Sequence, residues 1–546
     1  MIYIRLFYIL VFVSFGTNVI AQPVLDWAER YNGAGSSFDV PVKMILQDDG
    51  NIVVAGSTIG SGTLSDISII KYSNNGTELW AESFNGPDNS TDNARSIAVD
   101  PSGNIYVTGF ATSSNVQKLV LLKYNSSGQL MWSRLFDTAG VVNSFGEALT
   151  ISGDGFIYVT GFARNASNNF DVLTLKYDSN GNFIWWRSFN GLGNGDDMPV
   201  NVLTYGSDNI YVAGTGKNST GSIDVILLKY NSAGDLQFSR YYNGISSDED
   251  RPTSAALDLS GNVVISRVSI VPPNGFDYLT LKYDPAGALM WDKTYNGTGS
   301  SLDYTYQVIT DSLDNIYVTG SSRSGPLLGT EDAVTIKYNS AGVEQWVNRF
   351  DGTANGSDIG YCLAVDNSLN IYVGAAIDKG NTKLQIGVVK INPSGSTLWN
   401  VSYVHSPAPE DFPYSIAVDS SHNIYVCGIS FGDSITDYDI ATIKYSQSVS
   451  IDPVHSELPE AFFLYQNYPN PFNPATTIPF DILYSGYTEL TILDITGKLV
   501  ASLHSGYMPP GHYRFNFTPN HLPSGIYYYR IKSGSFSQTK KMLLLK

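Results

Sequence analysis

Cysteine, charge and histidine are all scarce in this chain of 546 residues. The two cysteines, Cys362 and Cys427, are too few for a disulfide-dense scaffold or a cysteine-ligated zinc site. We expect two buried free thiols, with a disulfide between them as the alternative. Charged residues make up 15% of the chain and aromatic residues 13%, which is typical of a folded, β-rich protein. The formal net charge of −18 argues against nucleic acid or an anionic membrane as the main partner.

Catalytic motifs are also missing. The sequence contains no HExxH motif, no nucleophile elbow and no phosphate-binding glycine loop. Four of the six histidines, namely His455, His504, His512 and His521, lie after residue 446. We therefore predict no catalytic residues and no cofactor, and we favour a binding protein over an enzyme.

Beyond its first twenty or so residues, the chain has no apolar run long enough to span a membrane. Near the start, Arg5 precedes the apolar run from Leu6 to Phe15, and small residues come before Gln22. This pattern is typical of an export signal, and it predicts cleavage between Ala21 and Gln22. An uncleaved anchor is the alternative, although the run is short for a membrane span. The mature chain is predicted to have no transmembrane segment.

The chain is rich in internal sequence repeats. The tract "KY" or "KI" recurs at intervals of about 53 residues, and "GNIYVTG" or a close variant recurs with the same spacing. A period of this length is typical of stacked or radial repeat architectures. The lysines that mark the eight units are Lys71, Lys123, Lys176, Lys229, Lys282, Lys337, Lys390 and Lys444.

Each unit contains four short β-prone runs separated by turn residues. In the second unit these runs are residues 94–100, 104–110, 118–124 and 129–136. Apolar and polar residues alternate along the runs, and no stretch keeps a helical period. Four antiparallel strands repeated around an axis make a β-propeller, so we predict an all-β protein with eight blades.

The two ends of the repeat array predict how the propeller closes. The eighth unit has no fourth run after Lys444, whereas residues 24–33 form a fourth run with no unit before it. A ring that pairs its N-terminal strand with its last blade needs this permutation, and closure removes two exposed sheet edges. A linear solenoid would need polar caps instead. We predict that residues near Trp27 close the ring beside residues 439–445.

Each fourth run carries one aromatic residue at a fixed position. Such rings can stack on a ligand, but one large ring per unit is what packing between neighbouring blades requires. We predict packing for this series, which is Trp27, Trp80, Trp132, Trp185, Phe238, Trp291, Trp346 and Trp399.

Aspartate opens the first run in seven of the eight units, and Ser144 replaces it in the third. These carboxylates are candidates for a ring that binds a cation such as calcium at one mouth of the channel. The alternative is that each one caps a turn by accepting backbone N–H groups. The series is Asp39, Asp92, Asp197, Asp250, Asp303, Asp358 and Asp411. A second series begins the third run and is predicted to be structural, paired with the lysines of that run: Asp66, Asp171, Asp224, Asp277, Asp332 and Asp439.

The repeat pattern, AVDxxGNIYVTG followed by LxKYNxxGxxxW, resembles the SBBP-type β-propeller repeat of secreted bacterial proteins. The resemblance covers residues 22–446. It implies the propeller fold but names no ligand, because propellers carry many unrelated activities.

The sequence pattern of the chain changes at Phe462, where the propeller repeats are no longer found. Short β-prone runs and turns predict a small immunoglobulin-like β-sandwich there, after a polar linker that contains two prolines. The tracts "YQNYPNPFNPATTIPF", "LTILDITGKLV", "PPGHYRFNF", "LPSGIYYYRI" and "TKKMLLLK" follow one another in this segment. Together they resemble the type A C-terminal sorting domain of the type IX secretion system. The positions that carry this match are Asn467, Pro469, Asn470, Pro471, Phe472, Asn473, Pro474, Gly497, Lys498, Gly511, Gly525, Tyr527, Lys540 and Lys541.

The second resemblance implies where the protein goes and what handles it. Its partner would be the type IX secretion machinery, and it would be secreted or displayed on the outer surface of a Bacteroidetes-like bacterium. The predicted organisation is a signal peptide over residues 1–21, a propeller over 22–446, a linker over 447–461 and a sorting domain over 462–546.

The ligand of the propeller is an extracellular glycan or protein in our interpretation. The loops 57–66, 215–224 and 321–332 differ from unit to unit, and variable loops on a fixed scaffold are where recognition usually occurs. The channel mouth is the other candidate place. The alternatives are a secreted propeller enzyme, such as a polysaccharide lyase or glycoside hydrolase, and a structural component of a surface layer.

Overall fold

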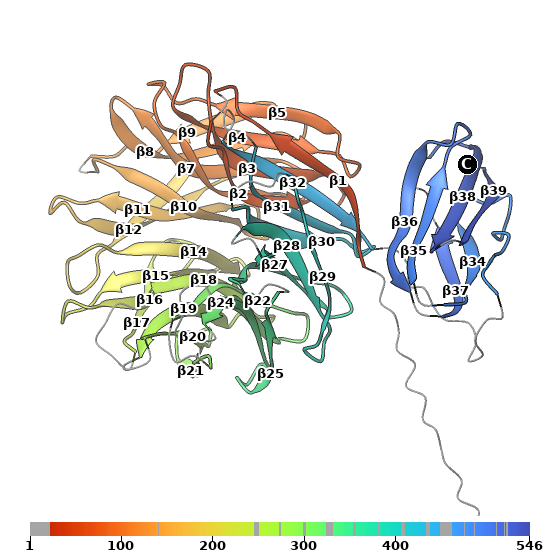
Figure 1. The fold of residues 1–546 in the computed structure, drawn as a ribbon. Coiled ribbons are helices and arrows are strands. Elements are labelled where there is room, and N and C mark those ends of the chain that lie inside the picture. The colour runs from red at the N-terminus through yellow and green to blue at the C-terminus, as the bar shows by residue number, and fades with distance from the viewer. Residues whose placement is uncertain are drawn as a thin grey trace, which may run out of the picture. The chain divides into compact units, whose positions relative to one another are not determined.

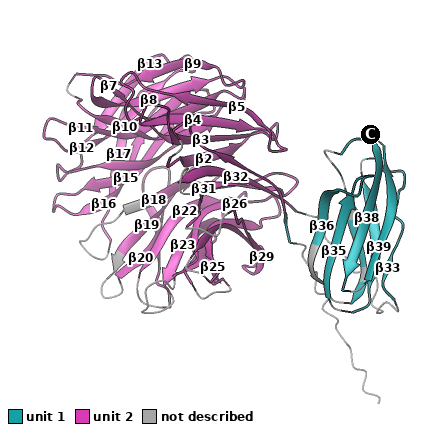
Figure 2. Ribbon diagram, turned by 45° about the horizontal axis from the view of Figure 1, so that its top comes forward, with its two compact units in different colours: residues 1–24, 447–546 teal, residues 25–446 magenta. Residues whose placement is uncertain are grey.

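The computed structural model divides the chain into two compact units, residues 25–446 and residues 447–546 together with 1–24 (Figures 1 and 2). The predicted signal peptide with Ala21, most of the predicted linker, Asp250 and Pro474 lie outside the described residues. The structure describes residues 22–545 except 36, 140, 245–250, 272–274, 299–301, 324–330, 353–355, 381–382, 406–409, 433–436, 448–460, 474, 485, 509, 518, 520–521 and 535.

The described part of residues 25–446 forms strands and no helix, arranged in eight four-stranded sheets. Sheets 1 to 4 contain β2 (Val40–Leu46), β3 (Ile52–Ile59), β4 (Ser65–Tyr72), β5 (Glu78–Phe84); β6 (Asn93–Val99), β7 (Ile105–Ser113), β8 (Val116–Tyr124), β9 (Leu130–Leu135); β10 (Ser144–Ile151), β11 (Ile157–Arg164), β12 (Phe170–Tyr177), β13 (Phe183–Phe189); and β14 (Met198–Tyr205), β15 (Asn209–Lys217), β16 (Ile223–Tyr230), β17 (Leu236–Tyr242). Sheets 5 to 7 contain β18 (Arg251–Leu257), β19 (Val263–Val271), β20 (Gly275–Tyr283), β21 (Leu289–Tyr295); β22 (Asp303–Thr310), β23 (Ile316–Arg323), β24 (Glu331–Tyr338), β25 (Glu344–Phe350); and β26 (Ile359–Val365), β27 (Ile371–Asp378), β28 (Leu384–Ile391), β29 (Thr397–Ser402). Sheet 8 contains β30 (Phe412–Val418), β31 (Ile424–Phe431), β32 (Tyr438–Ser446) and, beside β32, the N-terminal strand β1 (Val24–Tyr31).

The sheets lie side by side around a common axis (Figure 1). The first strand of each sheet packs against the first strand of the next, and β30 of sheet 8 packs against β2 of sheet 1. The first strands therefore line the inside of the arrangement. This is a β-propeller fold, so the all-β fold class predicted from the repeats is confirmed.

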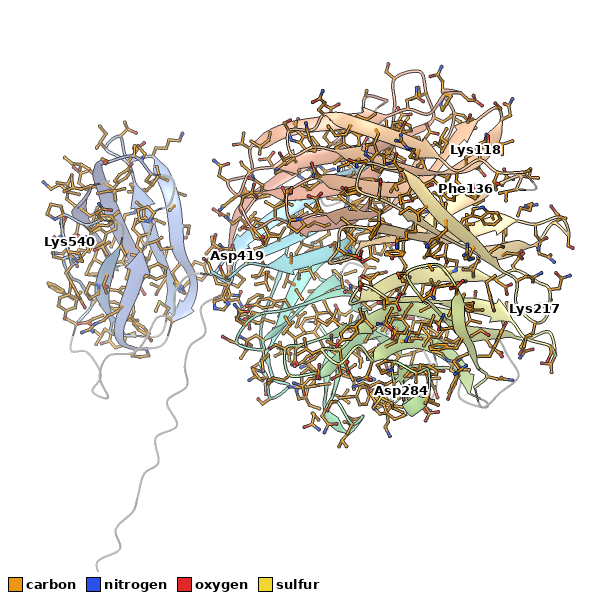
Figure 3. The ribbon with its side chains drawn as sticks, turned by 180° about the vertical axis from the view of Figure 1, so that it is seen from behind. Lys118, Phe136, Lys217, Asp284, Asp419 and Lys540 are labelled. Atoms are coloured by element: carbon orange, nitrogen blue, oxygen red, sulfur yellow. The ribbon has the colours of Figure 1, made fainter. Side chains whose placement is uncertain are left out.

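Hydrophobic cores fill the spaces between neighbouring sheets. Between sheets 2 and 3, for example, the buried Phe136 (labelled in Figure 3) packs edge-on against Trp186 with ring centroids 5.7 Å apart. The same core contains Leu119 from β8 and Leu173 from β12, both fully buried. Alternate residues of each strand thus face one neighbouring sheet or the other, as the sequence pattern predicts.

One contact between neighbouring sheets recurs around the propeller. The indole of Trp185 in sheet 3 lies under the turn that joins β16 to β17 in sheet 4. A Cβ added to Gly234 in that turn would lie 2.8 Å from the Trp185 ring, and Gly234 has a φ of 84°. The indole Nε1 of Trp185 and the Nζ of Lys176 both donate to the carbonyl oxygen of Ser232, at 3.0 and 2.9 Å. We call this pair of bonds to one turn carbonyl the carbonyl clamp. The prediction that the fourth-strand aromatic residues pack between repeats is confirmed here.

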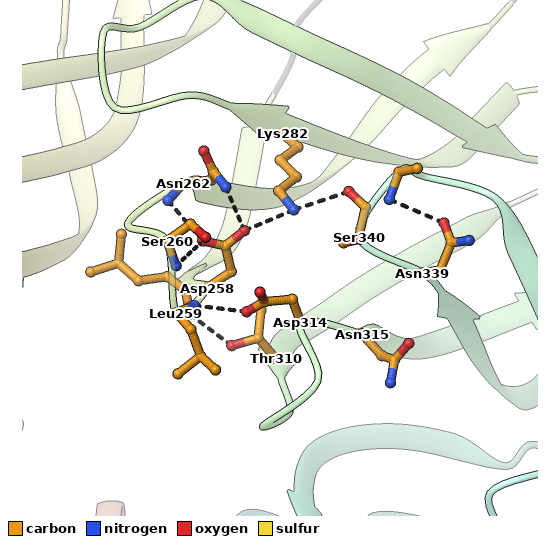
Figure 4. A network of polar contacts seen from close by, with 12 residues as sticks. Asp258, Leu259, Ser260, Asn262, Lys282, Thr310, Asp314, Asn315, Asn339 and Ser340 are labelled. Atoms are coloured by element: carbon orange, nitrogen blue, oxygen red, sulfur yellow. Dashed lines mark hydrogen bonds and ion pairs between the residues drawn. The ribbon is translucent and has the colours of Figure 1, made fainter.

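The carbonyl clamp between sheets 5 and 6 also contains a buried ion pair (Figure 4). Lys282 Nζ donates to the carbonyl oxygen of Ser340 at 3.0 Å and lies 2.8 Å from Asp258 Oδ2. The side chains of Lys282 and Asp258 are 2% and 1% exposed. Asp258 in turn accepts the backbone N–H groups of Ser260 and Asn262, each at 2.9 Å, so the same carboxylate shapes the turn and neutralises the lysine.

The two ends of the chain form the same contact between sheets 8 and 1. Trp27 Nε1 from β1 and Lys444 Nζ from β32 both donate to the carbonyl oxygen of Asn74, each at 3.0 Å. Arg30 of β1 forms an ion pair of 2.7 Å with Asp439 of β32. Segments from opposite ends of the sequence therefore make the contacts that consecutive repeats make elsewhere.

Both cysteines are buried and free. Burial raises the pKa of the Cys427 thiol to about 12 and also raises that of Cys362. Both therefore remain protonated at neutral pH and behave as small apolar side chains.

In the unit of residues 447–546, the described residues form two sheets that share one hydrophobic core. Their strands, in sheet order, are β33 (Phe463–Leu464), β34 (Thr476–Ile482) and β37 (Gly511–Phe517) in one, and β36 (Leu499–Met508), β35 (Gly486–Leu493), β38 (Gly525–Ser533) and β39 (Phe536–Leu544) in the other.

The Asn-Pro stretch of this unit is bonded to its last strand. Phe472 is buried, and its N–H donates to the carbonyl oxygen of Leu543 at 3.0 Å. The side-chain oxygen of Asn470 accepts the N–H of Leu543 at 2.9 Å. Asn467 is also buried, and its N–H donates to the hydroxyl of Tyr529 at 2.8 Å. The first and last tracts of the sorting motif are thus parts of one structural unit.

The remaining described motif positions occupy turns, strand ends and the surface. Gly497 has a φ of 84° in the turn capped by Asp494, and the N–H of Lys498 donates to that carboxylate at 3.0 Å. The hydroxyl of Tyr527 donates to the carbonyl oxygen of Pro523 at 2.9 Å. Asn473 is exposed, the prolines Pro469 and Pro471 follow cis peptide bonds, Gly511 and Gly525 open β37 and β38, and Lys540 and Lys541 lie on β39. No helix in the described residues is long and apolar enough to cross a membrane.

Candidate functional site

The predicted aspartate series lies at the junctions between neighbouring sheets. The backbone N–H groups of Gly191 and Lys217 donate to the two carboxylate oxygens of Asp197, at 2.5 and 2.8 Å. Asp358 is held in the same way, by Gly352 at 2.6 Å and Asp378 at 3.1 Å. The other described members are likewise buried and accept backbone N–H groups: Asp39, Asp92, Asp303 and Asp411. Each of these carboxylates therefore caps its own junction.

The second aspartate series faces the first across these junctions. Burial, together with the charge of Asp303 in sheet 6, raises the pKa of Asp277 in sheet 5 to about 6. Between sheets 2 and 3 the position of the second series holds Lys118, and Ser144 there replaces the aspartate of the first series. Burial also raises to about 6 the pKa values of Asp39, Asp197, Asp358 and Asp411.

The pairing predicted between the second series and the third-strand lysines is wrong, because those lysines donate to turn carbonyls. Asp332 pairs with Arg349 at 2.7 Å and Asp439 with Arg30 at 2.7 Å. Asp224 accepts the side-chain amide of Asn218 at 2.8 Å. Among the residues that the structure describes, no group of three or more His, Cys, Asp or Glu side chains is placed to hold a metal ion.

The junction carboxylates predict how stability depends on pH. A carboxyl group whose pKa is about 6 in the folded state and near 4 in the unfolded state holds its proton more tightly when folded. Its contribution to the free energy of unfolding is complete below about pH 4 and is lost as pH rises through about 6. When the pH is lowered from 7.5 to 5, the free energy of unfolding of the Asp197→Asn variant should therefore rise by about 1 kcal/mol less than that of the parent chain. Urea unfolding at the two pH values measures this. Asp48→Asn, at an exposed site, is the control, and an equal effect of the two substitutions would contradict the assignment.

A second feature of the first strands points to a binding site. Each of the eight has a β-bulge at the third residue after the aspartate, or after Ser144 in sheet 3, so that this residue has no partner on the second strand. Bulges re-aim a side chain and are common next to active sites. The eight residues, which we call the bulge ring, are Val42, Arg95, Glu147, Val200, Thr253, Tyr306, Tyr361 and Tyr414.

Three successive members of the bulge ring are tyrosines. Tyr306 and Tyr414 are 36% and 42% exposed, and each is the most exposed residue of its strand. The rings of Tyr306 and Tyr361 have centroids 4.7 Å apart, and Phe412 packs edge-on against Tyr361 at 6.0 Å. Burial raises the pKa of all three tyrosines, so their hydroxyls remain hydrogen-bond donors at neutral pH. Tyr306, Tyr361, Phe412 and Tyr414 come from the first strands of sheets 6, 7 and 8, and we call this group the aromatic wall.

The charged members of the bulge ring follow on sheets 2 and 3. Burial raises the pKa of Glu147, and the nearby Arg95 lowers it in part. On sheet 1, Lys43 directly follows the bulge residue Val42; its side chain is exposed to solvent, yet desolvation lowers its pKa. Lys43 lies on β2, which packs against the first strands β6 and β30, so protein surrounds a side chain that water still reaches. Such a position is expected on the inside of the ring of first strands, where a ligand would be held from several sides.

The bulge ring was not predicted from the sequence. The sequence feature that marks the ring is the third residue after each recurrent aspartate. This residue is tyrosine in the tracts "DYTY", "DIGY" and "DFPY". In a regular strand that residue would face a neighbouring sheet, and only the bulge turns it out of that register.

Family models match separate segments of the chain. Residues 466–545 match the family model of the secretion system C-terminal sorting domain. Residues 82–115 and 402–435 match the SBBP β-propeller repeat, and residues 47–77 match the β-propeller domain of unknown function DUF5122. The chain therefore combines repeats that match the SBBP β-propeller model with a segment that matches a secretion-system sorting domain, which implies handling by the type IX secretion system.

Individual relatives are distant. An uncharacterised WD repeat-containing protein of Acanthamoeba polyphaga mimivirus is 22% identical over 490 residues, which are 72% of this chain and 33% of that protein. The chain thus spans about a third of the length of this curated relative. The structure of PorZ, a surface component of the type IX secretion system of Porphyromonas gingivalis, is similar at 13% identity and a TM-score of 0.33, covering 92% of this chain and 74% of PorZ. The polysaccharide lyase Uly1 is similar at 10% identity and a TM-score of 0.38, over 67% of this chain and 93% of the lyase.

Proposed function

We propose that this protein is an exported binding protein whose propeller recognises a glycan or protein outside a Bacteroidetes-like cell. The observation that carries the proposal is the bulge ring, in which a repeated frame presents different side chains at one position of each first strand. Glu147 is the only carboxylate among its eight members, and a glycoside-cleaving site would need two that converge. Binding is therefore favoured over hydrolysis.

The eight sheets are the blades of one closed ring in this proposal, with β1 as the outer strand of the last blade. The contacts of Trp27, Arg30 and Lys444 support closure by β1. The mature chain would begin at Gln22 and carry the propeller to residue 446. A linker over 447–461 and an immunoglobulin-like sorting domain over 462–546 would follow.

Export by the sorting domain can be tested in a bacterium with a type IX system. The full chain should reach the cell surface or the medium, whereas a chain that ends at residue 461 should remain in the periplasm. Protease accessibility on intact cells and immunoblots of the medium distinguish the two places. Equal surface exposure of both chains would contradict the proposal for export.

A further inference from the structure

The aromatic wall of the bulge ring has the chemistry of a sugar-binding surface. Tyr306, Tyr361 and Tyr414 come from three successive first strands, and the first two rings lie 4.7 Å apart. Exposed aromatic side chains that adjoin one another leave apolar area in contact with water. The C–H faces of pyranose rings cover such area, and the phenol hydroxyls can bond the sugar hydroxyls.

The charges beside this wall indicate which sugars fit. Burial raises the pKa of Glu147 and the charge of Arg95 lowers it in part, so these two groups interact with each other. Lys43, on the sheet between Tyr414 and Arg95, has no carboxylate within ion-pair distance in the described part of the chain. A lysine that protein surrounds and that lacks a counter-charge favours an anion beside it. The chain as a whole carries a net charge of −18, so this positive charge is local to the ring.

We propose that the bulge ring binds an acidic oligosaccharide, with sugar rings against Tyr306, Tyr361 and Tyr414 and a sugar carboxylate on Lys43. This inference rests on the proposed binding function and names the ligand class. An acidic peptide could offer the carboxylate but has no pyranose faces for the tyrosines.

Calorimetric titration of the mature full-length chain with tetragalacturonate and with its carboxyl-reduced, neutral counterpart tests the inference. Tyr361→Ala should weaken binding of both sugars about tenfold, and Tyr361→Phe should retain most of it. Lys43→Gln should weaken binding of the acidic sugar about tenfold and leave the neutral one unchanged. The matched controls are Phe183→Ala on the outer strand β13 and Lys293→Gln on the outer strand β21, both at exposed positions outside the bulge ring.

The outcomes separate this inference from the proposed function. Binding that is unchanged in both Tyr361→Ala and Lys43→Gln, with melting curves like those of the parent chain, overturns the bulge ring as the site but leaves a glycan-binding protein. Equal loss of both sugars in Lys43→Gln overturns the carboxylate contact. Absence of binding to either sugar, or preference for poly-glutamate, overturns the sugar class, while export remains tested by the chain that ends at residue 461.

Discussion

Deleting residues 22–33 should lower the melting temperature of the mature chain by at least about 10 °C, the largest effect expected of any change considered for this protein. The deletion removes β1, exposes the edge of β32 and leaves Asp439 and Lys444 without Arg30 and Asp26. It also removes the Trp27 ring from the turn at Gly76. Loss of a packed tryptophan alone costs about 3 kcal/mol.

A point substitution tests the same contact without shortening the chain. Trp27→Ala should lower the melting temperature clearly, whereas Leu25→Ala on the same strand should have little effect because Leu25 is 46% exposed. Thermal melts followed by circular dichroism measure both. If the deleted chain melts like the parent, β1 does not close the propeller.

Removing Asp258 should be the most damaging single change inside the repeats. Asp258→Ala leaves Lys282 buried without its counter-ion and should cost about 3–5 kcal/mol of the free energy of unfolding. The matched control is Asp137→Ala, which removes an ion pair of 2.6 Å from Lys118 whose aspartate is 68% exposed. That substitution should cost no more than about 1 kcal/mol. Urea unfolding measures both.

Asp258 also shapes its turn, and a second variant separates the two roles. Asp258→Asn can still accept the N–H groups of Ser260 and Asn262, but it carries no charge. In combination with Lys282→Met, it should recover most of the lost stability, because no unpaired charge then remains buried. Recovery in Asp258→Asn alone, with Lys282 still present and unpaired, would mean that the turn, and not the ion pair, accounts for the cost.

Much of the propeller fold could be predicted from the sequence, because a residue that recurs in every repeat marks a contact that every repeat makes. The aromatic residue of the fourth run recurs because a glycine turn of the next repeat packs against it, as Gly128 does against Trp80. The fold class followed from four strands per unit. The carbonyl clamp was not predicted, since a lysine beside a tyrosine in a strand gives no sign that its partner is a backbone oxygen in the next repeat.

The candidate site was harder to predict for a physical reason. Residues needed for stability recur in every repeat. Residues that recognise a ligand differ from repeat to repeat at one position, as Arg95, Glu147 and Tyr361 do. The bulge that gathers these residues is a shift of register by one residue, and strand patterns with a period of two do not reveal it. The recurrent aspartates drew attention to the right strand, but the structure places them at the junctions, where backbone N–H groups occupy their oxygens.

The most direct test of the central claim is a crystal structure of the mature chain with bound tetragalacturonate. We expect a pyranose ring in van der Waals contact with Tyr361 and a sugar carboxylate within hydrogen-bond distance of Lys43 Nζ. Sugar bound only at the outer loops, such as residues 57–66 or 215–224, with the bulge ring empty, would contradict it.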